Sequence, residues 1–156
     1  MMIDTTAALD CFRRSDAVIA GLLEQALAAE HPVAVPKPKP EVEYFGTIVT
    51  SIISQQMSTK AADAIRGRVL ALIGEFTPQT VGAADFDALK ACGLSGQKTK
   101  YLKHNAGVWH TIPVSDFKAM TDEAVIRELT RLYGIGRWTA EMFLMFSLAR
   151  PDVFSY

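Results

Sequence analysis

The stretch Leu129–Ala140, which reads LTRLYGIGRWTA, contains the clearest chemical signal in this sequence. Leu129 and Leu132 have the spacing that closes a helix on its apolar face, and Gly134 can adopt the positive φ that ends one. Gly136 removes a side chain where the next helix begins, so the first amides of that helix are uncovered. Uncovered amides at a helix start bind anions such as phosphate. The stretch therefore predicts two helices joined by a tight hairpin that can hold an anion.

These glycines have two other interpretations. An ordinary helix-to-helix turn with a glycine cap would explain the Gly-Ile-Gly triplet alone, and it stays open. A dinucleotide-binding fingerprint fits poorly, because Thr139 stands where its third glycine would be and no strand precedes it.

Composition limits the classes of protein that this sequence can encode. Its 156 residues are 49% hydrophobic, which is enough for one ordinary domain with a core. The net charge of −1 argues against holding nucleic acid by positive charge alone, although it leaves local contact through amides open. No apolar run is long enough to span a membrane, and Met1–Asp10 has no basic segment typical of a signal peptide. We therefore expect a cytoplasmic protein without membrane contact.

Side-chain metal chemistry is not predicted. His31, His104 and His110 have no ligand spacing. Cys11 and Cys92 lie far apart in the chain, and we interpret them as small core residues in a reducing compartment.

The elements that position the hairpin are all predicted to be helical, because no segment alternates with the period of a strand. Helical spacing runs from Thr5 to Ala29, with a restart at Ser15-Asp16, and predicts seven buried residues: Leu9, Phe12, Val18, Ile19, Leu22, Leu23 and Leu27. Residues 31–41 form a proline- and lysine-rich linker. Further helices are expected at 42–55, from a Ser58 cap to 73, and at 79–84, 85–92, 98–109, 122–133 and 137–148.

Three motifs, taken in order, resemble one family. They are Ile52–Ser58 (IISQQMS), Gly93–Leu102 (GLSGQKTKYL) and the hairpin at 129–140 with its Trp138. Together they resemble the helix-hairpin-helix DNA glycosylase superfamily, and most closely its 3-methyladenine DNA glycosylase II branch. The resemblance runs from about Val42 to Phe154.

The resemblance implies an all-α glycosylase fold that is incomplete at its C-terminus. Residues 1–30 would belong to a second helical lobe, and residues 42–156 would form the central lobe. The implied activity is DNA repair: a monomer flips an alkylated purine out of duplex DNA and hydrolyses its N-glycosidic bond, because the bond cannot be reached in the stack.

The resemblance also assigns roles to single residues. Gln56 would be the wedge that fills the space of the flipped nucleotide. The hairpin would clamp one DNA strand through its amides. We assign DNA contacts to six residues: Gly134, Gly136, Arg137, Thr139, Ser58 and Lys98. No cofactor is required, although main-chain carbonyls of Thr130, Leu132 and Ile135 could hold Na⁺ or K⁺.

Trp138 indicates the type of reaction. Family members that also cut the strand carry a lysine there, which forms a Schiff base, and an indole cannot do this. We therefore expect a monofunctional glycosylase with water as the nucleophile. Trp138 and Met142 would line the base pocket, with Phe143 beside them, and the indole would stack on a cationic alkylated purine.

One expected residue is missing. The family's catalytic aspartate would fall about two positions past Tyr156, and Asp152 does not match it. We interpret the sequence as a truncated product or a partial record, and expect it to be inactive alone. A non-catalytic DNA-binding module and a purely structural helical bundle remain alternatives.

Overall fold

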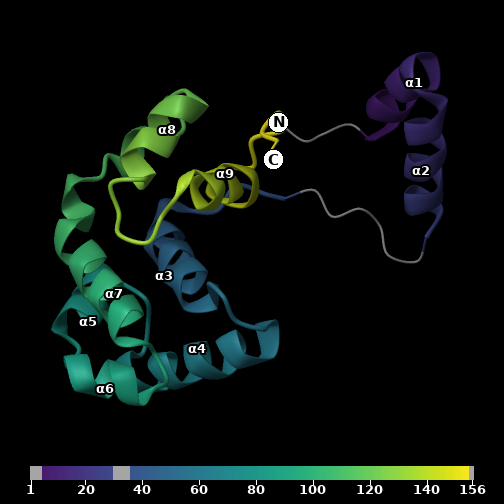
Figure 1. Cartoon of the computed structure of the whole chain (residues 1–156). Helices are drawn as coiled ribbons and strands as arrows, with labels where there is room; N and C mark the ends of the chain where they lie inside the picture. Colours follow the sequence, from purple (N-terminus) through teal and green to yellow (C-terminus); the bar gives the residue numbers. More distant parts are fainter. Residues whose placement is uncertain (1–4, 30–35, 155–156) are drawn as a thin grey trace. The chain divides into compact units, whose positions relative to one another are not determined.

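The structure is a computed structural model that describes residues 5–29 and 36–154 (Figure 1). Contacts along the chain divide it into two units, Met1–Lys37 and Pro38–Tyr156. All regular elements in the described ranges are helices, so the predicted all-α class is confirmed. The division falls inside the predicted linker. Residues 31–35 of that linker lie outside the described residues, and the assignment of residues 1–30 to a second lobe stays a prediction.

The N-terminal unit is a pair of helices, α1 (Thr5–Ser15) and α2 (Ala17–Ala28). The predicted restart between them is confirmed, because the Asp16 carboxylate accepts hydrogen bonds from the amides of Val18 and Ile19. An ion pair between Arg13 and Glu24, at 2.7 Å, joins the two helices.

The burial predicted for this unit is partly wrong. Leu9, Phe12 and Leu23 are partly buried, whereas Val18, Ile19, Leu22 and Leu27 are exposed, Val18 by 73% and Leu22 by 60%. The physical reason is that a helix in a two-helix pair can cover only the stripe that faces its partner. Helical periodicity identifies an apolar face but does not supply the neighbour that would bury it.

The second unit carries the remaining helices. Their bounds are η1 (Glu41–Glu43), α3 (Tyr44–Ser54), α4 (Thr59–Ile73), α5 (Pro78–Ala83), α6 (Phe86–Ala91), α7 (Gly96–Val108), η2 (Trp109–Thr111), η3 (Val114–Asp116), α8 (Asp122–Leu129) and α9 (Arg137–Phe146). The predicted helices agree with these within a few residues. The helix expected at 122–133 ends early, because residues 130–133 belong to the hairpin turn. The short 3-10 turns were not predicted, since three residues carry no periodic pattern.

Helix starts in this unit are set by local side chains. Ser58, Thr77, Asp85, Ser95 and Thr121 each accept a hydrogen bond from an amide in the first turn of the helix that follows. Such caps satisfy donors that have no partner inside the helix. These capping residues therefore set where each of the short helices begins.

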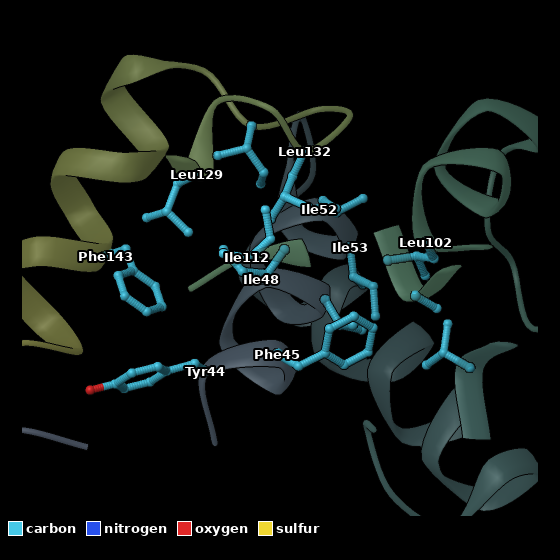
Figure 2. Packing of buried hydrophobic residues seen from close by; sticks show 14 of the residues in the cluster. Tyr44, Phe45, Ile48, Ile52, Ile53, Leu102, Ile112, Leu129, Leu132 and Phe143 are labelled. Atoms are coloured by element: carbon cyan, nitrogen blue, oxygen red, sulfur yellow. The ribbon is translucent and has the colours of Figure 1, made fainter. Parts of the chain in front are cut away.

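Helix α3 lies at the centre of the hydrophobic core. It buries six residues on one face: Tyr44, Phe45, Ile48, Val49, Ile52 and Ile53. Figure 2 shows five of these side chains, all but Val49, near Leu102 of α7, Leu129 of α8 and Phe143 of α9, and all of them belong to one buried cluster. The core thus ties the hairpin helices to α3.

An aromatic cluster fixes α9 against the start of α3. Tyr44 lies edge-on to Phe143 (Figure 2), with ring centroids 5.1 Å apart. It also stacks on Phe117, with ring centroids 6.3 Å apart. Such pairs add to the free energy gained from apolar burial. Burial also raises the pKa of the Tyr44 phenol.

We expect Phe143→Ala to lower the free energy of unfolding by about 3 to 5 kcal/mol, because it opens a cavity between α9 and α3. Phe146→Ala is the matched control on the same helix: this ring is 54% exposed, so its removal should change stability by less than about 1 kcal/mol. Denaturant unfolding followed by circular dichroism measures both. Equal effects of the two substitutions would contradict the assigned core.

Candidate functional site

The hairpin between α8 and α9 requires a glycine at position 134. Gly134 has a φ of +79°, in the left-handed region that favours glycine. A Cβ atom there would also lie 2.6 Å from the ring of Tyr101. Both the backbone angle and the close approach of Tyr101 exclude a side chain, as the sequence predicted for the helix end.

Gly136 differs from Gly134 because nothing within the described protein requires it. It precedes α9 with φ −93° and ψ 176°, which other residues adopt readily, and a Cβ atom there would meet open space. No side chain caps the α9 amides at this position. The first turn of α9 therefore presents uncovered N–H groups beside a residue without a side chain, which is the arrangement that an anion can approach.

Two side-chain amides hold the hairpin in place. Asn105 on α7 is 1% exposed; its amide donates to the Tyr133 carbonyl at 3.0 Å and its oxygen accepts from the Tyr133 amide at 2.8 Å. Gln55 donates from Nε2 to the Gly134 carbonyl at 2.7 Å. Sequence reasoning missed both. A polar Asn105 beside Leu102 and Ala106 on a buried face was the available signal for the first.

A cleft of about 980 Å³ opens beside the hairpin helix. Its walls come from α3, from the turn after it, from α4 and from α9, and include Thr50, Ser51, Ser54, Arg66 and Leu70. The exposed face of α3 thus forms one wall while its other face is in the core.

The cleft brings together four of the predicted site residues. Gln56, Trp138, Thr139 and Met142 all line it, and the Trp138 indole is 63% exposed. Phe143, expected beside the pocket, is instead buried in the core, because the neighbouring position on a helix points about 100° away. The large exposed indole in a concave site is available for stacking.

Gln56 has an unusual backbone conformation. The turn Ser54–Met57 is closed by a hydrogen bond from the Met57 amide to the Ser54 carbonyl, at 3.2 Å. Gln55 has φ −53° and ψ 130°, and Gln56 has a φ of +57°, as in a type II turn. That third position normally takes glycine, and another residue there costs about 1 kcal/mol. The exposed side chain of Gln56, at the edge of the cleft, is therefore attached to a strained backbone.

Three residues expected to contact DNA make contacts within the protein. Ser58 caps α4, its Oγ accepting from the Ala61 amide at 3.3 Å. Arg137 pairs with Glu123 and, at 2.8 Å, with Glu141. The hydrogen bond to Glu123 raises the pKa of Arg137, and the same bond lowers the pKa of Glu123.

The third of these residues, Lys98, points into the protein. Its ammonium donates to the carbonyls of Ile53 and Gln55. Burial lowers its pKa. DNA contacts by Ser58, Arg137 and Lys98 stay predictions, and internal bonds occupy their polar atoms in this structure.

The described residues hold no cluster of three His, Cys, Asp or Glu side chains that could bind a metal ion. Of the carbonyls considered for a monovalent cation, that of Leu132 accepts a hydrogen bond from the Ile135 amide at 3.2 Å.

Glu43 and Glu75 are the carboxylates among the described cleft residues, and Asp152 is exposed outside the cleft. In the described ranges no helix is long and apolar enough to cross a membrane.

Comparison with known proteins gives consistent results. The family described as HhH-GPD superfamily base excision DNA repair protein matches residues 49–150. DNA-3-methyladenine glycosylase 1 of Schizosaccharomyces pombe is 38% identical over 117 residues, which are 71% of this chain and 51% of that protein. DNA-3-methyladenine glycosylase 2 of Escherichia coli is 33% identical over 126 residues, covering 72% and 44%. The chain thus spans about half the length of the curated relatives it matches.

Solved structures are similar over more of the chain. The DNA-3-methyladenine glycosidase of Bacillus halodurans has a TM-score of 0.79 at 33% identity, covering 97% of this chain and 67% of that one. The 3-methyladenine DNA glycosylase of S. pombe, solved with abasic DNA, has a TM-score of 0.72 at 31% identity, covering 85% and 67%. The hairpin, the turn after α3 and Trp138 all lie within the matched residues 49–150, and the chain belongs to the HhH-GPD superfamily of base excision DNA repair proteins.

Proposed function

We propose that this chain recognises alkylated purines in duplex DNA and serves their removal as a monofunctional DNA glycosylase. The observation that carries the proposal is that one cleft holds both the exposed Trp138 and the strained turn at Gln56, beside the uncovered amides of α9. The names of the relatives support the substrate class. A monomeric state and a cytoplasmic location stay predictions.

The hairpin would hold one strand by its phosphates. Gly136 lacks a side chain where no described residue excludes one, so an outside group is the better reason for glycine there. Uncovered amides at the start of α9 suit an anion, and Thr139 lies in the first turn of the same helix. The hairpin carbonyls of Thr130, Leu132 and Ile135 could then hold Na⁺ or K⁺ beside the phosphate, as the family resemblance implies.

Gln56 and Trp138 would share the work of base flipping. The Gln56 side chain projects from its turn at the lip of the cleft and would fill the space that the base leaves, where its amide can bond the orphaned partner. The Trp138 face would receive the flipped base. A purine alkylated at N3 or N7 is cationic, so the indole would add about 0.5 to 2 kcal/mol of cation–π attraction for damaged over normal bases.

The reaction would be hydrolysis without strand cleavage. Trp138 stands at the family's lysine position, and an indole forms no Schiff base with the sugar. The resemblance places the catalytic aspartate about two positions past Tyr156. The roles proposed for the described residues are clamping, flipping and base recognition.

Gly136→Leu should weaken binding to a duplex containing an abasic-site analogue about tenfold or more, because the side chain would cover the α9 amides. The fold should survive, since position 136 has ordinary backbone angles and open space. Gly67→Leu, also in open space but on α4 outside the cleft, is the control. Fluorescence anisotropy gives both affinities. An unchanged affinity for Gly136→Leu would remove the hairpin from the DNA interface.

Gln56→Gly should separate stability from function. Glycine relieves the left-handed strain, so the free energy of unfolding should stay the same or rise by up to about 1 kcal/mol. Flipping should fall sharply, as seen by a smaller fluorescence increase from 2-aminopurine beside the lesion analogue. Gln79→Ala, an exposed glutamine on α5, is the control. If the fluorescence increase stays at the wild-type level, Gln56 is not the wedge.

Release of 3-methyladenine from methylated duplex DNA distinguishes a glycosylase from a non-catalytic DNA-binding module. The chain extended past Tyr156 through the position of the implied aspartate should release the base, and the same protein with that aspartate changed to asparagine should not. Binding to abasic DNA without any release by the extended protein would favour the module.

A further inference from the structure

The turn that carries Gln56 is tied to helix α7 by one lysine. Lys98 lies in the first turn of α7, 43 residues beyond Gln55 in the chain. Its Nζ donates to the carbonyl of Ile53 and to the carbonyl of Gln55, each at 2.7 Å. One acceptor is in the last turn of α3 and the other is in the turn itself, so the ammonium bridges the helix end and the residue that precedes Gln56.

The chemistry of a helix end explains why this contact is effective. The last carbonyls of a helix have no partner inside it, and a cation there also interacts favourably with the helix dipole. The hydrogen bonds of a charged donor are stronger than neutral ones. Lys98 therefore fixes the direction in which the chain leaves α3, at the point where Gln56 must enter its left-handed conformation.

The same turn is tied to the hairpin on its other side. Gln55 donates to the Gly134 carbonyl at 2.7 Å, and Gly134 itself must be a glycine. The turn Ser54–Met57, called the wedge turn below, is thus held between α7 and the hairpin by two side-chain contacts. One comes from Lys98 and the other from Gln55. Neither contact is local in sequence.

We propose that Lys98 is a positioning residue for Gln56: its bonds to the Ile53 and Gln55 carbonyls hold the wedge turn in its left-handed shape and, through Gln55, in register with the hairpin. The inference rests on the proposed role of Gln56 in flipping. It differs from a phosphate contact by Lys98, because the ammonium is directed at carbonyls inside the protein.

Helix α7 offers a matched control. Lys103 donates from Nζ to the carbonyls of Gly82 and Ala84, at the end of α5. It uses the same chemistry, on the same helix, away from the wedge turn. Substituting each lysine by methionine removes one ammonium and one pair of bonds and keeps a long apolar side chain.

The test uses a duplex with an abasic-site analogue and an adjacent 2-aminopurine. At saturating protein we expect Lys98→Met to lose at least half of the wild-type fluorescence increase, and Lys103→Met to keep it, with similar melting temperatures for the two variants. Lys98→Arg, which keeps charged donors, should restore most of the increase. A full increase with Lys98→Met, or an equal loss with Lys103→Met, would overturn the inference.

Salt dependence separates positioning from phosphate binding. Each phosphate contact that is lost lowers the slope of log affinity against log salt by about one. Lys98→Met should leave the slope at the wild-type value, and a slope lowered by about one would assign Lys98 to the DNA backbone instead.

If Lys98→Met does not fold, Gln55→Leu tests the other tether, with the same expected loss of fluorescence. No binding or fluorescence increase with the wild-type chain would contradict the proposed function itself, which keeps the two failures distinct.

Discussion

Helix α3 has two faces with different tasks, and the candidate site depends on that division. Its apolar face, from Tyr44 to Ile53, is buried in one core cluster with residues of α4, α7, α8 and α9. Its polar face, with Thr50, Ser51 and Ser54, is a wall of the cleft. Because the core fixes one face, the cleft wall, the turn after the helix and the packing of α9 are all set by the same burial. A loss of apolar packing around α3 would therefore displace every part of the site at once.

The two hairpin glycines illustrate two different reasons for the same residue type. Gly134 is required by the protein itself, since its φ is positive and Tyr101 occupies the space of a side chain. Gly136 has ordinary backbone angles and open surroundings, so a bound group outside the protein is the better explanation for a glycine at this position. The distinction matters because both look identical in a motif.

Several Lys and Arg side chains in the second unit, Pro38–Tyr156, donate hydrogen bonds to backbone carbonyls. Lys98 and Lys103 bind the ends of α3 and α5, Arg68 donates to the Cys92 carbonyl at 2.7 Å, and Arg150 donates to those of Phe117 and Met120. Arg137 is held by two carboxylates. A chain with a net charge of −1 thus uses many of its cations internally, which agrees with a site that would grip phosphate by amides more than by side-chain charge.

The sequence by itself determined most of the helices, the caps at Asp16 and Ser58, and the hairpin, because periodicity, capping and tight turns depend on residues within about four positions of each other. The order of three motifs indicated the family. Gln56, Trp138 and Met142 could be assigned to a site from the sequence, because the three motifs resemble those of the family in residue type and in their order along the chain. Only the tertiary structure decided that Lys98 turns inward, that Gln55 and Asn105 hold the hairpin, and that Phe143 lies in the core. The hydrogen bonds of Lys98, Gln55 and Asn105 join residues 28 to 79 positions apart, and Phe143 packs on Tyr44 at the start of α3. No local pattern encodes which distant group a side chain will meet.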